Sequence, residues 1–328
     1  MTRDPDQGRS STQAASTRWS FPIGRVFGVE IRVHVSFFLL VALFGYASTG
    51  PEGQGLVSGL SWLVVLFACV VVHELAHCVV GQAHGAVVRD IVLLPIGGMS
   101  RLERLPPRPE DEFAMAIAGP IASVALGVTA GVVAGAVGVA LLPIDLATGS
   151  LLARLCWANL LLAAFNLLPA FPLDGGRMLR ATLARHHGEA VATRRAAKVG
   201  RAVAVAMMAL GFLVDVWLLL IGMFVWFAAT AEERATLQHL RLRGVHVRDL
   251  MHAPVDGAAL DRAAPGGLGA GVVLDADDEV EDDLPTLVGA PHGVLPVADH
   301  AIVVGELRVA DVAEWLRACA EAGDGRAA

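Results

Sequence analysis

Charged residues are scarce in this chain. Lysine, arginine, aspartate and glutamate make up 17% of its 328 residues, whereas 55% are hydrophobic and the mean hydropathy is +0.59. Soluble globular domains carry about 25% charged residues, so the composition excludes an ordinary soluble enzyme and favours a polytopic membrane protein. The net charge of −7 says little about the apolar part, because the run Asp275–Asp283 alone contains seven acids.

Cysteine is also rare. The sequence has four cysteines, of which Cys69, Cys78 and Cys156 lie in apolar runs and Cys319 lies near the C-terminus. No Cys-x-x-Cys pair is present, so we predict neither a disulfide framework nor a cysteine metal site.

The N-terminus lacks the apolar core of a signal peptide. Residues 1–20 are rich in Ser, Thr, Gln, Arg and Asp, and we expect them to form a disordered tail. The first apolar run, Val33–Ala47, begins too far along the chain for an ordinary signal peptide. We therefore predict a membrane domain over residues 21–233, followed by a separate domain over residues 244–318.

Long apolar runs are abundant. A membrane-spanning helix needs about 20 apolar residues, and the runs predict a polytopic α-helical protein with six crossings. These are Val33–Ser48, Leu56–Gln82, Phe113–Leu142, Leu151–Leu168, Val199–Leu213 and Val216–Ala229. Lys and Arg occur before the first run, between the second and third, between the fourth and fifth, and after the sixth. The other loops, such as Thr49–Gly55 and Pro143–Ser150, contain neither. By the positive-inside rule, both termini are predicted to be cytoplasmic.

Two segments outside the runs have other patterns. Val87–Met99 is rich in β-formers and contains Gly97–Gly98, which predicts a hairpin or sheet edge after the second span. Such an edge can pair with an extended peptide by strand addition; an ordinary amphipathic loop is the alternative. In residues 244–318, short apolar strands (Gly293–Val297, Ala301–Val304), a helical segment (Val309–Ala318) and the loop Pro265–Gly271 predict a small cytoplasmic α/β domain.

The second apolar run contains the pattern His-Glu-x-x-His at His73, Glu74 and His77. Residues four apart share one face of a helix, so both histidines can reach a single zinc ion. Glu74 lies beside them, placed to take a proton from an attacking water. Ionisable residues in hydrocarbon cost about 2.5–3.5 kcal/mol each and are retained mainly where they function.

A catalytic zinc site usually has a third protein ligand. Asp174 is the best candidate, because Pro169 and Pro172 end the fourth apolar run just before it. We expect Gly175–Gly176 to allow a sharp turn beside its carboxylate. Asn166 ends the same run and is predicted to contact the substrate backbone or the developing oxyanion; a helix cap or a helix–helix contact is the alternative.

The remaining histidines are weaker candidates. His34 begins the first predicted span. It either lines the mouth of the active site or binds metal transiently, or it is an interfacial histidine held by headgroups or backbone. His84, His186 and His187 fall in predicted cytoplasmic loops, where we expect them to be solvated.

Together these residues resemble the site-2 protease family of intramembrane zinc metalloproteases. The resemblance covers about Gly24 to Glu233; its motifs are His73–His77, Gly97–Gly98, Ala118–Pro120, and Asn166–Pro169 followed by Asp174–Gly176. It implies that His73, His77 and Asp174 bind one zinc per chain, that Glu74 is the general base, and that Gly97 and Gly98 line the site. It further implies hydrolysis of peptide bonds within or near transmembrane helices, in a single-pass substrate such as an anti-sigma factor.

The C-terminal region resembles a cystathionine-β-synthase (CBS) domain less closely. Val247–Met251 is similar to the opening of a CBS repeat, and Gly305–Asp311 is similar to the Gly-x-x-Thr-x-x-Asp nucleotide signature, with Arg308 in place of the Thr. The resemblance implies regulation through an adenine nucleotide, with Asp311 at the ribose. A degenerate regulatory or dimerisation module, in a homo-oligomer, is the alternative.

Two other functions remain open at this point. Intramembrane His and Asp also suit a zinc transporter or a metal-storing membrane protein, but the sequence shows no internal repeat of the kind that transporters have. A catalytically inactive relative that binds transmembrane partners is the other, and the intact Glu74 argues against it. No nucleic-acid partner is expected.

Overall fold

The computed structural model describes residues 19–49, 55–95, 97–104, 106–146, 149–252, 273–290, 293–299 and 302–321. The chain divides into two compact units, one formed by Trp19–Glu233 and the other containing Arg234–Ala328. The predicted N-terminal tail falls outside the described residues up to residue 18, but its last residue, Ser20, begins a strand, so the predicted end of the tail is wrong there.

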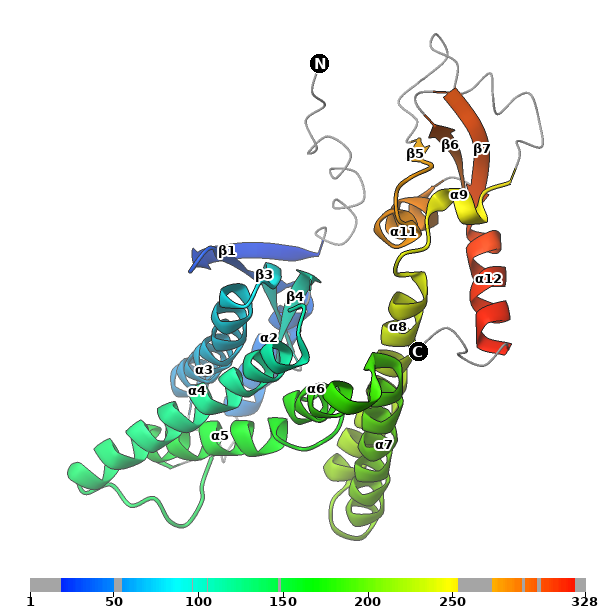
Figure 1. Ribbon diagram of the computed structural model, residues 1–328. Coiled ribbons are helices and arrows are strands. Elements are labelled where there is room, and N and C mark those ends of the chain that lie inside the picture. Colours follow the sequence, from blue (N-terminus) through cyan, green and yellow to red (C-terminus); the bar gives the residue numbers. More distant parts are fainter. Residues whose placement is uncertain are drawn as a thin grey trace. The chain divides into compact units, whose positions relative to one another are not determined.

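The larger unit is mostly helical (Figure 1). Its helices are α2 (Ser36–Ser48), α3 (Leu56–Ala83), α4 (Pro109–Ala136), α5 (Leu151–Asn166), α6 (Asp174–His187), α7 (Glu189–Val214) and the first part of α8 (Val216–Leu242). Helix α4 packs against α3, α5 and α6, and α6 packs against α7. Helix α4 is therefore the element that joins the others around the site described below.

Four helices in the described part of the chain, α3, α4, α7 and α8, are long and apolar enough to cross a membrane. They agree with four of the predicted spans, although α7 begins ten residues before Val199 and α8 continues well beyond Ala229. Helices α2 and α5, at the other two predicted spans, are apolar but shorter. The first predicted span also began too early, because Val33 and His34 belong to a strand.

A four-stranded sheet lies against α3, in the order β1 (Ser20–Val26), β2 (Val29–His34), β3 (Val87–Leu94), β4 (Gly97–Arg104) (Figure 1). The predicted hairpin after the second span is confirmed as the antiparallel pair β3–β4, whereas β1 and β2 were not predicted. Strand β2 pairs antiparallel with β1 and parallel with β3. Alternate side chains of β2, Val29, Ile31 and Val33, are buried with Phe67 and other apolar residues of α3.

The chain leaves α3 through a glycine turn. Gly85 has a φ of +88°, a left-handed conformation that stops the helix, and the amide of Ala86 donates to the carbonyl of Gly81. Strand β3 begins directly afterwards, at Val87. Helix α4 then starts at Pro109, and proline is tolerated there because the first amide of a helix has no partner within the helix. Its first turn also contains three acids, whose negative charge interacts favourably with the helix dipole.

The smaller unit is an α/β structure, as predicted. It contains α9 (Val247–Leu250), β5 (Leu274–Asp275), α11 (Val280–Gly289), β6 (Val294–Asp299), β7 (Ile302–Arg308) and α12 (Val309–Glu321). Strand β6 lies between β5, with which it is parallel, and β7, with which it is antiparallel. Val247, Val280, Val297 and Leu307 are fully buried in its apolar core. The predicted loop Pro265–Gly271 lies outside the described residues.

Candidate active site

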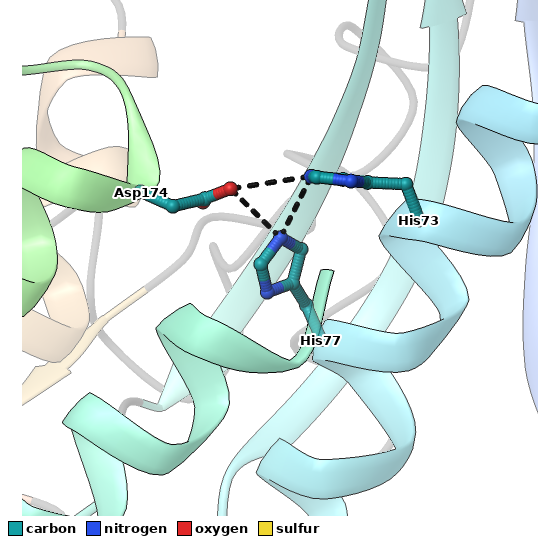
Figure 2. A group of neighbouring side chains, drawn as sticks. All are labelled: His73, His77 and Asp174. Carbon is teal, nitrogen blue, oxygen red and sulfur yellow. Dashed lines mark hydrogen bonds and ion pairs between the residues drawn. The ribbon is translucent and has the colours of Figure 1, made fainter. Parts of the chain in front are cut away.

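Two imidazoles and one carboxylate meet at a single point of the larger unit (Figure 2). The Nε2 atoms of His73 and His77 each lie 3.2 Å from Oδ2 of Asp174 and 3.2 Å from one another. The histidines come from adjacent turns of α3, and Asp174 comes from the start of α6, about a hundred residues later in the sequence. The predicted third ligand therefore faces the predicted pair.

This donor set fits zinc. Zinc in proteins is bound tetrahedrally by nitrogen and oxygen atoms at about 2.0–2.2 Å, which puts neighbouring ligand atoms about 3.3 Å apart. The three distances of 3.2 Å between the ligand atoms match the edges of one face of such a tetrahedron. A catalytic zinc keeps its fourth position for water or substrate, and three protein donors leave that position open.

Hydrogen bonds to the other ring nitrogens fix both histidines. Nδ1 of His77 lies 2.7 Å from the carbonyl oxygen of Met115, and Nδ1 of His73 lies 2.8 Å from the hydroxyl of Ser123. A carbonyl only accepts, so Nδ1 of His77 carries the hydrogen, and in the neutral ring Nε2 presents its lone pair toward Asp174. Both partners are on α4, which thus orients both ligands.

Gly119 of α4 lies directly beneath the two rings. A Cβ atom at this position would lie 2.2 Å from Nε2 of His77 and 2.7 Å from Nε2 of His73, closer than non-bonded atoms approach. The helix therefore reaches the metal-binding atoms only because this residue has no side chain. The Ala118–Gly119–Pro120 motif gains a physical role from this contact.

Asp174 is the first residue of α6, where the helix dipole favours a carboxylate. Gly175 and Gly176 do not form the sharp turn that the sequence suggested, because both lie in the first turn of this helix. A Cβ at Gly175 would lie 2.3 Å from the carbonyl oxygen of Leu167, and one at Gly176 would lie 2.6 Å from backbone atoms of Ala170. The glycines let α6 pack onto the preceding loop, which places Asp174.

Glu74 lies on the side of α3 that faces β4. Its Oε2 accepts a hydrogen bond of 2.5 Å from the hydroxyl of Ser100. A Cβ at Gly98 would lie 2.7 Å from Cγ of Glu74, so the strand backbone passes directly over this side chain. Gly98 therefore contacts Glu74, and the adjacent Gly97 begins β4 with a φ of +136°.

Three other predicted residues make local hydrogen bonds within their own segments. The Asn166 side-chain amide donates to the carbonyl oxygen of Leu162 in its own helix at 3.0 Å, a helix-end contact. His34 ends β2, and its Nδ1 lies 2.7 Å from the hydroxyl of Ser36, at the start of α2. Asp311 is in the smaller unit, where its carboxylate accepts from the backbone amide of Arg308 at 3.1 Å.

The sequence did not predict the residues that hold the two histidine ligands and the base. Ser123, Ser100 and the carbonyl of Met115 belong to no metal-ligand pattern, and a carbonyl is invisible in a sequence. The only signal for Ser123 was a small polar residue one turn after Gly119 in an apolar run. Ser100 lies two residues after Gly98, a spacing that puts both on one face of a strand.

The chain is similar to several known proteins. A family model described as Peptidase family M50 matches residues 61–149 and 135–211, which include His73, His77 and Asp174. Zinc metalloprotease MJ0392 of Methanocaldococcus jannaschii is 33% identical over 238 residues, covering 71% of this chain and 66% of that protein. The Mycobacterium tuberculosis protein Rip3 is 35% identical over 340 residues, covering 94% of this chain and 79% of that protein. The solved structure of a site-2 protease from Methanocaldococcus jannaschii matches with a TM-score of 0.51 and 33% identity, over 66% of this chain and 95% of that one.

Proposed function

The chain belongs to peptidase family M50, the site-2 proteases, and is an intramembrane zinc metalloprotease; we propose that it cleaves membrane-anchored proteins within or near their transmembrane helices. The observation that carries the proposal is that the ligand atoms of His73, His77 and Asp174 lie 3.2 Å from one another. Glu74 is beside them on α3, directly after His73 in the sequence. A metal store needs the three ligands but not the glutamate, so the four residues together favour hydrolysis.

The proposed mechanism divides the work between the ligands, the base and the residues that orient the ligands. His73, His77 and Asp174 would hold the ion, which when bound would supply a Lewis acid for the water and the scissile carbonyl. Glu74 takes the proton from the attacking water and then gives it to the leaving amine. Ser123 and the Met115 carbonyl keep the imidazole rings oriented throughout.

We propose that α2 and α5 also cross the membrane, giving six crossings and cytoplasmic termini. The hydrocarbon core is about 30 Å thick, whereas the 13 residues of α2 extend only about 20 Å. Such a short crossing requires the bilayer to be thin beside the site or the adjoining loop to enter it. The distribution of Lys and Arg supports this orientation, because alternate loops lack both.

We propose that the substrate, a single-pass membrane protein, docks as an extended strand on β4. This strand is at the edge of the sheet and has a neighbour, β3, on one side. An extended peptide added to an edge strand bonds to it through alternate carbonyls and leaves the others free for attack, whereas the carbonyls of a helix are bonded internally. Because Gly98 of β4 packs on Glu74, a peptide docked there would lie close to the base.

For the smaller unit we propose a regulatory module of CBS type. Its Asp311 carboxylate lies 3.4 Å from His252 and also accepts from the Arg308 amide. The hydrogen bond to Arg308 is that of an acid in the first turn of a helix with the preceding backbone amide. This supports a degenerate module more than a ribose-binding one.

Proteolysis of a single-pass transmembrane peptide by the purified chain in detergent tests the proposed function. We expect wild type to cleave it and Glu74→Gln to be slower by at least 10²-fold, because the proton acceptor is lost. Asp174→Asn should lose both zinc and activity. Asp215→Asn, at the exposed α7–α8 turn, and Glu110→Gln, exposed on α4, are matched controls that should behave as wild type.

Cleavage by Glu74→Gln at the wild-type rate would show that the hydrolytic assignment is wrong. Undiminished zinc in Asp174→Asn would remove Asp174 from the ligand set. Loss of activity in Asp215→Asn or Glu110→Gln would mean that amide substitution damages the protein at any position.

A further inference from the structure

Glu74 and Ser100 belong to a short chain of hydrogen bonds that the mechanism above does not use. Sγ of Cys78 donates to Oγ of Ser100 at 3.5 Å, and this hydroxyl donates to Oε2 of Glu74 at 2.5 Å. Glu74 and Cys78 are one helical turn apart on α3, and Ser100 lies between them from β4. The thiol turns the single hydroxyl hydrogen toward the carboxylate, because a hydroxyl that accepts from one side donates to the other.

The packing around this contact is tight. A Cβ at Gly98 would lie 2.7 Å from Cγ of Glu74 and 3.2 Å from Cγ1 of Val70, so the helix side chains and the strand backbone touch. Cys78 is only 1% exposed. The hydroxyl of Ser100 is thus held on both sides, and the Glu74 carboxylate has little freedom to move away from it.

We propose that Ser100 is a positioning residue for Glu74, an inference that rests on the proposed function. The hydroxyl holds the carboxylate by Oε2 and leaves Oε1 to take the proton of the attacking water. A general base contributes only when it lies within hydrogen-bonding reach of that proton. A side chain as long as glutamate gains from being held there before the substrate arrives, because less conformational freedom is then lost in the reaction.

The same strand also links this device to substrate binding. Strand β4 holds Glu74 through Ser100 and, in the proposed function, pairs with the substrate through its outer edge. A peptide docked on this strand would therefore lie beside a base that is already held in place. The proposal predicts an effect on the chemical step and not on the affinity for substrate or zinc.

The test compares Ser100→Ala, Ser100→Thr and the control Ser61→Ala in the full-length protein. Ser61 is on the same helix as Glu74, but its hydroxyl is exposed and bonds to the carbonyl of Val57. The kcat and KM for a transmembrane peptide and the zinc content are measured for each variant. We expect Ser100→Ala to lower kcat about tenfold, the effect of one hydrogen bond to a charged group, with KM and zinc within about twofold of wild type.

Ser100→Thr should restore most of kcat, because it keeps the hydroxyl and suits a strand. If Ser100→Ala does not fold, Ser100→Cys takes its place, since it nearly keeps the volume but donates weakly. A wild-type kcat in the variant that folds would overturn the proposal, as would a loss carried by KM or by zinc. Glu74→Gln in the same assay separates the two hypotheses: if it cleaves normally, the proposed function fails whatever Ser100 does. If Glu74→Gln is inactive and Ser100→Ala is unimpaired, only the role of Ser100 is wrong.

Discussion

The guanidinium of Arg180 bonds to the carboxylate of Glu112 and so joins α6 to α4. Nε of Arg180 lies 3.0 Å from Oε1 of Glu112, and the two side chains are 11% and 12% exposed. Helix α6 begins with the ligand Asp174, and α4 carries the Met115 carbonyl that orients His77. The ion pair therefore ties the carboxylate ligand to the helix that positions the histidines.

Arg180→Ala should destabilise this connection. It leaves the Glu112 carboxylate buried without its cation, a change that costs about 3 kcal/mol when a buried pair loses one partner. We expect a lower Tm in detergent and less zinc bound at limiting zinc concentration. Arg185→Ala, an exposed position on the same helix, is the control; equal effects at both positions would show that α6 needs only its net charge.

Gly119→Ala should abolish zinc binding. The added methyl group would lie 2.2 Å from Nε2 of His77, so either the ring or the helix must move. Gly135→Ala is the matched change on the same helix, where nothing lies within 4 Å of the added carbon, and it should stabilise α4 by about 0.5–1 kcal/mol. Zinc content and Tm measured on both variants check this, and a zinc-replete Gly119→Ala protein would contradict the described packing.

Ser123→Ala should weaken zinc binding without removing a ligand. The variant loses the hydrogen bond that orients His73, and such outer contacts contribute about 10–100-fold to metal affinity. Competition with a chelator of known affinity measures the zinc Kd. Ser61→Ala, which removes an exposed hydroxyl from α3, should leave the Kd unchanged. An unaltered Kd in Ser123→Ala would mean that packing alone orients the ring.

Removal of the metal should be reversible and selective. Dialysis against a strong chelator should abolish cleavage and lower the Tm, because a ligand present at about 100 times its Kd stabilises the folded state by about 2.7 kcal/mol. Zinc should restore both properties. Magnesium should restore neither, since it prefers octahedral oxygen ligands and the site offers two imidazoles and one carboxylate. Recovery with magnesium would show that the site is not a zinc site.

Several features of this protein follow from the sequence alone. The long runs of apolar residues predict the membrane helices, because about 20 such residues are needed to cross hydrocarbon, and α3, α4, α7 and α8 agree with them. The spacing of His73 and His77 predicts a shared helix face, because the helical repeat is local. The prolines before Asp174 predict the end of the fourth run, and α5 does end at Asn166.

Other features depend on contacts between distant segments. Strands β1 and β2 were not predicted, because their sheet depends on the pairing of β2 with β3, which comes after α3 in the sequence. Gly175 and Gly176 were misread as a turn, since a sequence does not show whether a glycine permits a backbone angle or a close approach. The hydrogen bonds that hold the site also join distant positions. Ser123 is 50 residues from His73, Met115 is 38 residues from His77, and Ser100 is 26 residues from Glu74.

The sequence by itself thus determined the chemical groups, the two histidines and the base on one helix, since these depend only on residue type and helical spacing. The tertiary structure alone decided that Asp174 meets them and that α4 and β4 hold them in place. Such contacts depend on how helices and strands pack, and packing is set by shape and by the absence of side chains at Gly98 and Gly119.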